Sequence, residues 1–172
     1  AQDIYVRCYV RIPTKWTESV YNCIGPGIAL ETPANWCALV IISYDGSSWK
    51  WGVRWKRWDL NWFNILESGV STITDNTWYC VELRFKTSAT ANVSLWVDGV
   101  QKVNDSTINP DTWTLPVCGG LAYIVSALAV DLTVDYDDYV CDSTYIGPEV
   151  AAGQPYISRV QGVQGMRSWG GI

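Results

Sequence analysis

The stretch that decides the fold is residues 78–99, WYCVELRFKTSATANVSLWVDG. Apolar and more polar side chains alternate through residues 79–86, which is the period-two pattern of a β-strand with one buried face. Small residues follow, and residues 93–97 repeat the alternation. Asp98-Gly99 is a pair that a type I′ turn favours, because both central residues of that turn need positive φ. The sequence therefore predicts a long antiparallel hairpin with one face in a core.

Other segments predict further strands around this hairpin. Residues 3–12 alternate, with a polar-aromatic face that we expect to be exposed to solvent: Tyr5, Arg7, Tyr9 and Arg11. Residues 38–44 are apolar without alternation, as in a strand covered on both faces. The apolar segment 117–134 is interpreted as strands with a break near residues 126–127, and a short strand is expected at residues 69–73. Residues 14–37 are expected to be a loop-rich connection, because they contain Gly25-Pro26-Gly27.

The hairpin residues also resemble a known family. Trp-Tyr-x-Val-Glu-Leu-x-Phe followed by Ser-Leu-Trp-Val-Asp-Gly is similar to the central hairpin of laminin-G-like domains, in the concanavalin A-like lectin/glucanase group. Residues 4–11 and 134–140 resemble the opening and closing strands of that family. The resemblance covers residues 3–147 and implies an all-β, two-sheet antiparallel β-sandwich, or jelly roll. It implies no single function, since the family includes lectins, glycosidases, adhesion modules and spacers.

The chain end differs from the rest in composition. Residues 1–147 make up the predicted jelly-roll domain, whereas residues 148–172 are rich in glycine and repeat Val-Gln-Gly once. We expect an extended C-terminal tail that can pair with a sheet edge or a neighbouring subunit.

The charge and the apolar content of the chain argue against two classes of partner, nucleic acid and the membrane interior. The 172 residues carry a net charge of −5, with 48% hydrophobic residues, 11 Trp and 10 Tyr. This acidity argues against nucleic acid as a partner, which needs a basic surface, and no apolar run is long enough to predict membrane insertion. One core cannot hold every aromatic side chain, so part of the excess is expected on the surface.

Residues 49–58, WKWGVRWKRW, contain many of the tryptophans. Either Trp49, Trp51 and Trp55 fill the core while Lys and Arg side chains face water, or the indoles form a stacking surface for sugars. The candidate residues for glycan binding or for a subunit interface are Trp51, Trp55, Trp58, Trp96, Tyr5 and Tyr9. Aromatic and Arg enrichment is typical of both kinds of site.

The six cysteines are interpreted as disulfide-forming: Cys8, Cys23, Cys37, Cys80, Cys118 and Cys141. Among the possible disulfides, Cys23–Cys37 is the most favourable local pairing, since it closes a Gly/Pro-containing loop. Two sequons, at Asn92 and Asn104, are candidate N-glycosylation sites. Together these features predict a secreted, cell-surface or virion-surface protein.

Catalysis is not expected from the sequence. There is no histidine, which excludes His-dependent triads. The five glutamates do not form the Glu-x-Asp-x-x-Glu cluster that the resemblance to glucanases would imply, and glycoside hydrolysis needs a carboxyl pair. Glu82, which alternates with Arg84, is interpreted as part of a surface ion pair. Asp137 and Asp138 are candidate ligands for Ca²⁺, which prefers oxygen ligands.

The sequence thus predicts an extracellular, non-catalytic jelly-roll module that binds glycans or mediates adhesion. The alternative is a structural subunit of a fibre, sheath or virion that assembles with copies of itself through its aromatic faces and tail. A glycoside hydrolase-like enzyme is the second alternative.

Overall fold

The computed structural model describes residues 2–17, 19, 21–30, 36–56, 62–67, 71–87, 92–106, 117–124 and 132–148. In these residues the chain forms strands and no helix, so no helix there is long and apolar enough to cross a membrane. The predicted tail, apart from Pro148, lies outside them, as does the expected break near residues 126–127.

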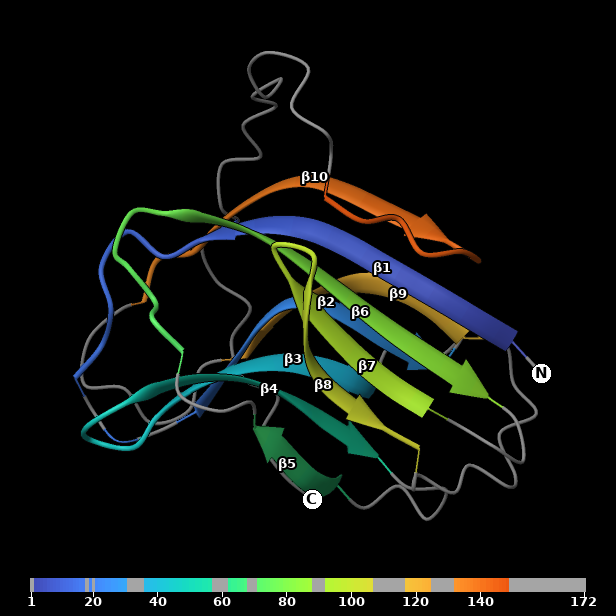
Figure 1. Cartoon of the computed structure of the whole chain (residues 1–172), viewed down its shortest axis with the longest axis horizontal. Helices are drawn as coiled ribbons and strands as arrows, with labels where there is room; N and C mark the ends of the chain where they lie inside the picture. The colour runs from blue at the N-terminus through green and yellow to red at the C-terminus, as the bar shows by residue number, and fades with distance from the viewer. Residues whose placement is uncertain are drawn as a thin grey trace, which may run out of the picture.

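The strands form two five-stranded sheets that face each other, with antiparallel pairing throughout (Figure 1). Sheet A has the order β10 (Asp135–Asp142), β1 (Gln2–Arg11), β6 (Trp78–Thr87), β7 (Asn92–Val97) and β8 (Val100–Asp105). Sheet B has the order β5 (Trp62–Glu67), β4 (Trp49–Lys56), β3 (Trp36–Tyr44), β2 (Tyr21–Leu30) and β9 (Val117–Ile124). The all-β, two-sheet prediction is confirmed.

The predicted hairpin is formed by β6 and β7, with Leu83 opposite Leu95. The turn that follows leads into β8, and its residues Asp98 and Gly99 have φ values of 51° and 76°, as a type I′ turn requires. Turns also form at Asp45-Gly46 and Asp75-Asn76, with positive φ at Gly46 and Asn76. Local turn chemistry therefore determines where these strands end.

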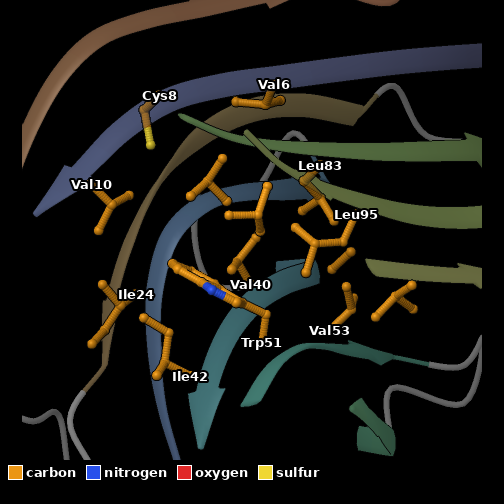
Figure 2. Packing of buried hydrophobic residues seen from close by; sticks show 14 of the residues in the cluster. Val6, Cys8, Val10, Ile24, Val40, Ile42, Trp51, Val53, Leu83 and Leu95 are labelled. Atoms are coloured by element: carbon orange, nitrogen blue, oxygen red, sulfur yellow. The ribbon is translucent and has the colours of Figure 1, made fainter. Parts of the chain in front are cut away.

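The core lies between the two sheets (Figure 2). β1 contributes Val6, Cys8 and Val10, as the alternation predicted, and each is fully buried. From β4 the indole of Trp51 enters the same core, 1% exposed, and contacts Tyr79 edge-on at 5.6 Å between ring centroids. A core built from both inner faces is the usual basis of sandwich stability.

β3 is covered on both faces, as its continuous apolar run predicted. Its side chains at Ala38, Val40 and Ile42 belong to the main core. On the other face, Leu39 and Ile41 form a smaller buried cluster with Cys23, against which Tyr21 packs. A central strand without alternation thus marks burial on both sides.

Two expectations about strand positions are wrong. Residues 21–30, expected within a loop-rich connection, form β2, an interior strand of sheet B between β3 and β9. The Gly25-Pro26-Gly27 segment is accommodated because the β2–β3 register is irregular between Cys23 and Gly27, and proline is tolerated at bulges where no ladder N–H is required. Of the strand expected at residues 69–73, residues 71–73 form only an isolated bridge, Ser71 with Trp49, and residues 69–70 lie outside the described residues. A strand forms earlier in the chain, β5 at Trp62–Glu67.

Candidate functional site

The outer face of sheet A, directed away from the core, carries rows of side chains that cross the strands. One row follows the register Tyr5, Arg84, Ser94 and Asn104. The neighbouring row, about 7 Å further along the strands, consists of Arg7, Glu82, Trp96 and Gln101. Aromatic, charged and amide groups from four strands therefore meet on one surface.

Three aromatic rings gather on this surface, and we call them the aromatic cluster: Tyr5, Trp96 and Tyr145. The ring centroids of Tyr5 and Trp96 are 6.2 Å apart, those of Trp96 and Tyr145 are 5.3 Å apart, and those of Tyr5 and Tyr145 are 6.3 Å apart. Tyr145 is 47% exposed, while the other two side chains are partly buried. The rings tilt against one another, which is a favourable arrangement for aromatic pairs.

Tyr145 belongs to residues 143–148, the closing segment, which follows β10 and turns back along sheet A (Figure 1). Glu82 holds this segment: its Oε1 accepts a hydrogen bond from the Ile146 N–H, and its Oε2 accepts one from the Gly147 N–H, both at 2.8 Å. Arg7 Nη1 donates to the Gly147 carbonyl at 2.9 Å. These two side chains, opposite each other on β6 and β1, attach the closing segment to the sheet.

The shape of the closing segment depends on Gly147. Its φ of 71° lies in the left-handed region, and a Cβ there would be 3.3 Å from Cε1 of Tyr145, so the tyrosine ring packs directly against this glycine. Further on, Pro148 Cγ lies 3.3 Å from where a Cβ on Gly99 would stand. The closing segment thus crosses the outer face from β10 to the β7–β8 turn.

Burial of Glu82 and Arg7 contradicts the prediction for both. Glu82 is 1% exposed and Arg7 3% exposed, whereas Arg7 was expected in water and Glu82 in a surface ion pair. Arg7 Nη2 instead pairs with Asp138 at 2.6 Å. Arg84 pairs with Asp3 through two hydrogen bonds, from Nε at 2.8 Å and from Nη2 at 2.6 Å.

The environment keeps the phenols of the cluster neutral. Burial raises the pKa of Tyr5, although the nearby Arg84 guanidinium opposes the shift. Burial also raises the pKa of Tyr145, and the charge of Glu82 adds to the effect. Desolvation likewise raises the pKa of Glu82 itself, with the N–H groups of Ile146 and Gly147 and the charge of Arg7 acting in the opposite direction. Both phenol O–H groups therefore remain available to donate and accept hydrogen bonds.

A compact amide cluster lies beside the aromatic cluster. Asn92 Nδ2 donates to Asn104 Oδ1 at 2.8 Å and to the Asp105 carbonyl at 3.1 Å. Ser94 Oγ bonds Asn92 Oδ1 at 2.6 Å and Asn104 Oδ1 at 2.9 Å. The two predicted sequon asparagines are thus direct neighbours on β7 and β8. Their glycosylation stays a prediction.

The structure separates the six predicted aromatic site residues. Tyr5 and Trp96 meet in the aromatic cluster, and Tyr9 lies on the same outer face, with the Arg7 guanidinium 5.7 Å from its ring. Trp51 and Trp55 were predicted for a binding surface or interface, and this is wrong because both are buried in the core. The side chain of Trp58 lies outside the described residues.

The sequence analysis missed Tyr145. Its segment follows the last strand and shows no alternation, so the only local signal was an aromatic residue just before Gly147-Pro148. The contact between Tyr145 and Tyr5 joins residues near opposite ends of the domain's sequence.

The disulfide prediction fails for four of the six cysteines, because Cys8, Cys23, Cys80 and Cys141 are free thiols. Cys23 lies opposite Ile41, so Cys37 is four residues further along β3, about 13 Å away, beyond the reach of a disulfide. Burial raises the pKa of Cys23 and Cys80 to about 11, which keeps these thiols protonated. The side chains of Cys37 and Cys118 lie outside the described residues.

The expected calcium ligands are engaged in other interactions. Asp138 binds Arg7, and Asp137 Oδ1 accepts the backbone N–H of Asp138 at 2.9 Å. Among the residues that the structure describes, no three acidic or cysteine side chains form a group suited to a metal ion. Calcium at this place stays a prediction that the side-chain arrangement does not favour.

The chain matches no family model and no curated protein, but solved structures share its fold. A double mutant of the alginate lyase Aly36B in complex with alginate trisaccharide has a TM-score of 0.61 at 13% identity, covering 84% of this chain and 71% of the lyase. An endo-beta-1,4-glucuronan lyase from the fungus Trichoderma reesei has a TM-score of 0.58 at 14% identity, covering 83% of this chain and 69% of that enzyme.

A toxin domain has the same fold. The ligand binding domain of Botulinum neurotoxin serotype D, in complex with N-acetylneuraminic acid, has a TM-score of 0.51 at 11% identity, covering 86% of this chain and 34% of that chain. At these identities the likeness shows a shared β-sandwich fold and nothing further.

These structures correct the expectation that the protein is not an enzyme. Alginate and glucuronan lyases are enzymes with this fold, so the fold provides no ground for excluding catalysis. The sequence analysis tested only hydrolytic chemistry, through a missing carboxyl pair and missing histidines. A lyase breaks its bond by elimination, and that chemistry does not need the carboxyl pair of a glycoside hydrolase.

Proposed function

We propose that the protein is a glycan-binding module of the concanavalin A-like, laminin-G-like kind, and that the aromatic cluster is its binding surface. The observation that carries the proposal is the meeting of Tyr5, Trp96 and Tyr145 from three distant segments on the outer face of sheet A. Aromatic faces pack against the apolar C–H faces of sugar rings, while neighbouring polar groups bond the hydroxyls. The alginate and N-acetylneuraminic acid complexes of similar structures support a saccharide as ligand.

Polar groups beside the rings fit this function. The Tyr5 and Tyr145 hydroxyls, the Asp3–Arg84 pair and the Asn92–Ser94–Asn104 amide cluster surround the three rings. Such groups supply the directional hydrogen bonds that distinguish one sugar hydroxyl pattern from another.

Replacing Trp96 by alanine tests this proposal. A glycan array first identifies the strongest-binding oligosaccharide, and calorimetry then measures its dissociation constant for each variant. We expect Trp96→Ala to weaken binding by about 2 kcal/mol, roughly thirtyfold, as for a central aromatic contact. The matched control is Trp78→Ala, since Trp78 is exposed at the first residue of β6 and contacts Arg11 instead of the cluster. Equal losses for both variants would contradict the assignment of the site.

A polysaccharide lyase is the second candidate, and it would use the outer face of sheet B. There the Arg54 guanidinium lies 5.4 Å from the centroid of the Tyr21 ring. A guanidinium binds carboxylates, and a tyrosine can act as a general acid or base. This pair therefore provides the two groups needed to remove a proton next to a sugar carboxyl group.

Incubation with alginate and with glucuronan tests the lyase candidate. If it is correct, we expect the ultraviolet absorbance of an unsaturated uronate product to appear, and Tyr21→Phe to lower that rate by roughly a hundredfold or more, as for loss of an acid–base group. Tyr139→Phe is the control, because Tyr139 is an exposed tyrosine on β10 of sheet A. A preparation that binds glycan but yields no unsaturated product would reject this candidate.

A further inference from the structure

The guanidinium beside the aromatic cluster is already neutralised within the protein. Arg84, whose guanidinium lies 5.3 Å from the centroid of the Tyr5 ring, donates Nε to Asp3 Oδ1 and Nη2 to Asp3 Oδ2. This is the two-point geometry in which a guanidinium binds a carboxylate most specifically. Lys86, the other cation at this end of β6, lies directly opposite Asp3 in the β1–β6 register. The Asp3 carboxylate therefore lies on the same face as both cations and is bound to Arg84.

The other arginines of this face are paired as well. Arg7 is buried and binds Asp138 and the Gly147 carbonyl, and Arg11 binds Asp135 at 2.8 Å. Glu82, beneath the closing segment, adds a negative charge close to Tyr145. The three cations Arg7, Arg84 and Lys86 and the three carboxylates Asp3, Glu82 and Asp138 together carry no net charge.

An acidic sugar would therefore have to displace Asp3 from Arg84 before it could form its own ion pair. This exchange breaks the Asp3–Arg84 pair in order to form a pair between Arg84 and the sugar carboxylate. The displaced Asp3 carboxylate then lies near the sugar carboxylate, which has the same charge. A neutral sugar meets no such competition, because the phenols and the amide cluster bond hydroxyls without a change of charge.

We propose that Asp3 is a specificity-determining residue that reserves the aromatic cluster for uncharged glycans. This inference rests on the glycan-binding function proposed above and names the substrate class of that site. It sets this protein apart from the similar structures that hold alginate and N-acetylneuraminic acid, both of which are acidic sugars.

The test measures binding of neutral and of uronic-acid or sialylated oligosaccharides of equal length, in low and in physiological salt. We expect the natural chain to bind the neutral oligosaccharides more tightly than the acidic ones. Asp3→Asn keeps the side-chain shape but leaves Arg84 with an unneutralised charge, so the affinity for acidic oligosaccharides should rise about tenfold, most strongly in low salt. Asp135→Asn is the matched control, because it frees Arg11 in the same way beside Trp78, away from the cluster.

Three results would overturn the inference. Binding of acidic glycans to the natural chain as tightly as neutral ones, with loss of that binding in Trp96→Ala, would leave the glycan-binding function intact and refute only the substrate class. A gain in affinity for acidic glycans in Asp3→Asn no larger than that in Asp135→Asn would refute the role of Asp3. Binding of neither glycan set would refute the glycan-binding function, and the inference with it.

Discussion

Trp51→Ala is expected to lower the free energy of unfolding by about 3–5 kcal/mol, the usual loss when a large aromatic side chain is removed from a core. Trp51 is 1% exposed and is among the largest fully buried side chains of the described residues. Its indole fills the space between the two sheets (Figure 2) and packs against Tyr79. The backbone of β4 is paired to both β3 and β5, so the sheets cannot close the resulting cavity.

Denaturant unfolding followed by circular dichroism measures this effect as a lower midpoint with an unchanged slope. Trp78→Ala removes the same indole from a surface position, 37% exposed, where its main contact is the Arg11 guanidinium at 4.8 Å. Its expected loss is about 1 kcal/mol or less, the range of an exposed cation–π contact. Comparable losses for the two variants would contradict a core position for Trp51.

Glu82→Ala is expected to destabilise the fold by about 3 kcal/mol and to weaken glycan binding at the same time. Removal of the carboxylate leaves the N–H groups of Ile146 and Gly147 without their acceptor and removes the negative charge opposite Arg7. Each buried group that loses its partner costs about 1–3 kcal/mol. Tyr145 directly precedes Ile146 in the closing segment, so its position beside Tyr5 depends on the same bonds.

The matched control for Glu82→Ala is Asp138→Asn, which removes the partly exposed partner of Arg7. Asparagine tolerates the positive φ of 49° at this position. It also keeps a side-chain oxygen that can accept a hydrogen bond from Arg7, so the expected loss is smaller than for Glu82→Ala. Denaturant midpoints and calorimetric affinities are measured on both variants. A Glu82→Ala protein of natural stability would show that the closing segment does not depend on this carboxylate.

The raised pKa of Glu82 adds a pH dependence with a definite sign. Its contribution to stability is fully present below its ordinary value of 4.5 and falls as the pH rises through the raised folded-state value. The alanine variant lacks this contribution. The stability difference between the natural chain and Glu82→Ala should therefore narrow as the pH is increased above 4.5, and a difference that widens over this range would contradict the direction of the pKa shift.

The sequence by itself determined the features that depend on near neighbours. The β6–β7 hairpin, the Asp98-Gly99 turn and the buried face of β1 all follow from alternation and turn residues within a few positions of each other. The two-sheet architecture followed from the same patterns together with the family resemblance. These features could be predicted because strand period and turn φ values are local properties of the chain.

Only the tertiary structure decided which surfaces are available to a ligand. The alternation of β4 allowed Trp51 to face the core or water, and packing of sheet A over sheet B placed it inside. In the sequence, Arg7 and Glu82 have the pattern of exposed residues. In the structure the closing segment covers them, and its Gly147 is 140 positions from Arg7. The same long-range contact brought Tyr145 to Tyr5 and Trp96. No local pattern specifies such contacts, because their formation depends on how the whole chain packs.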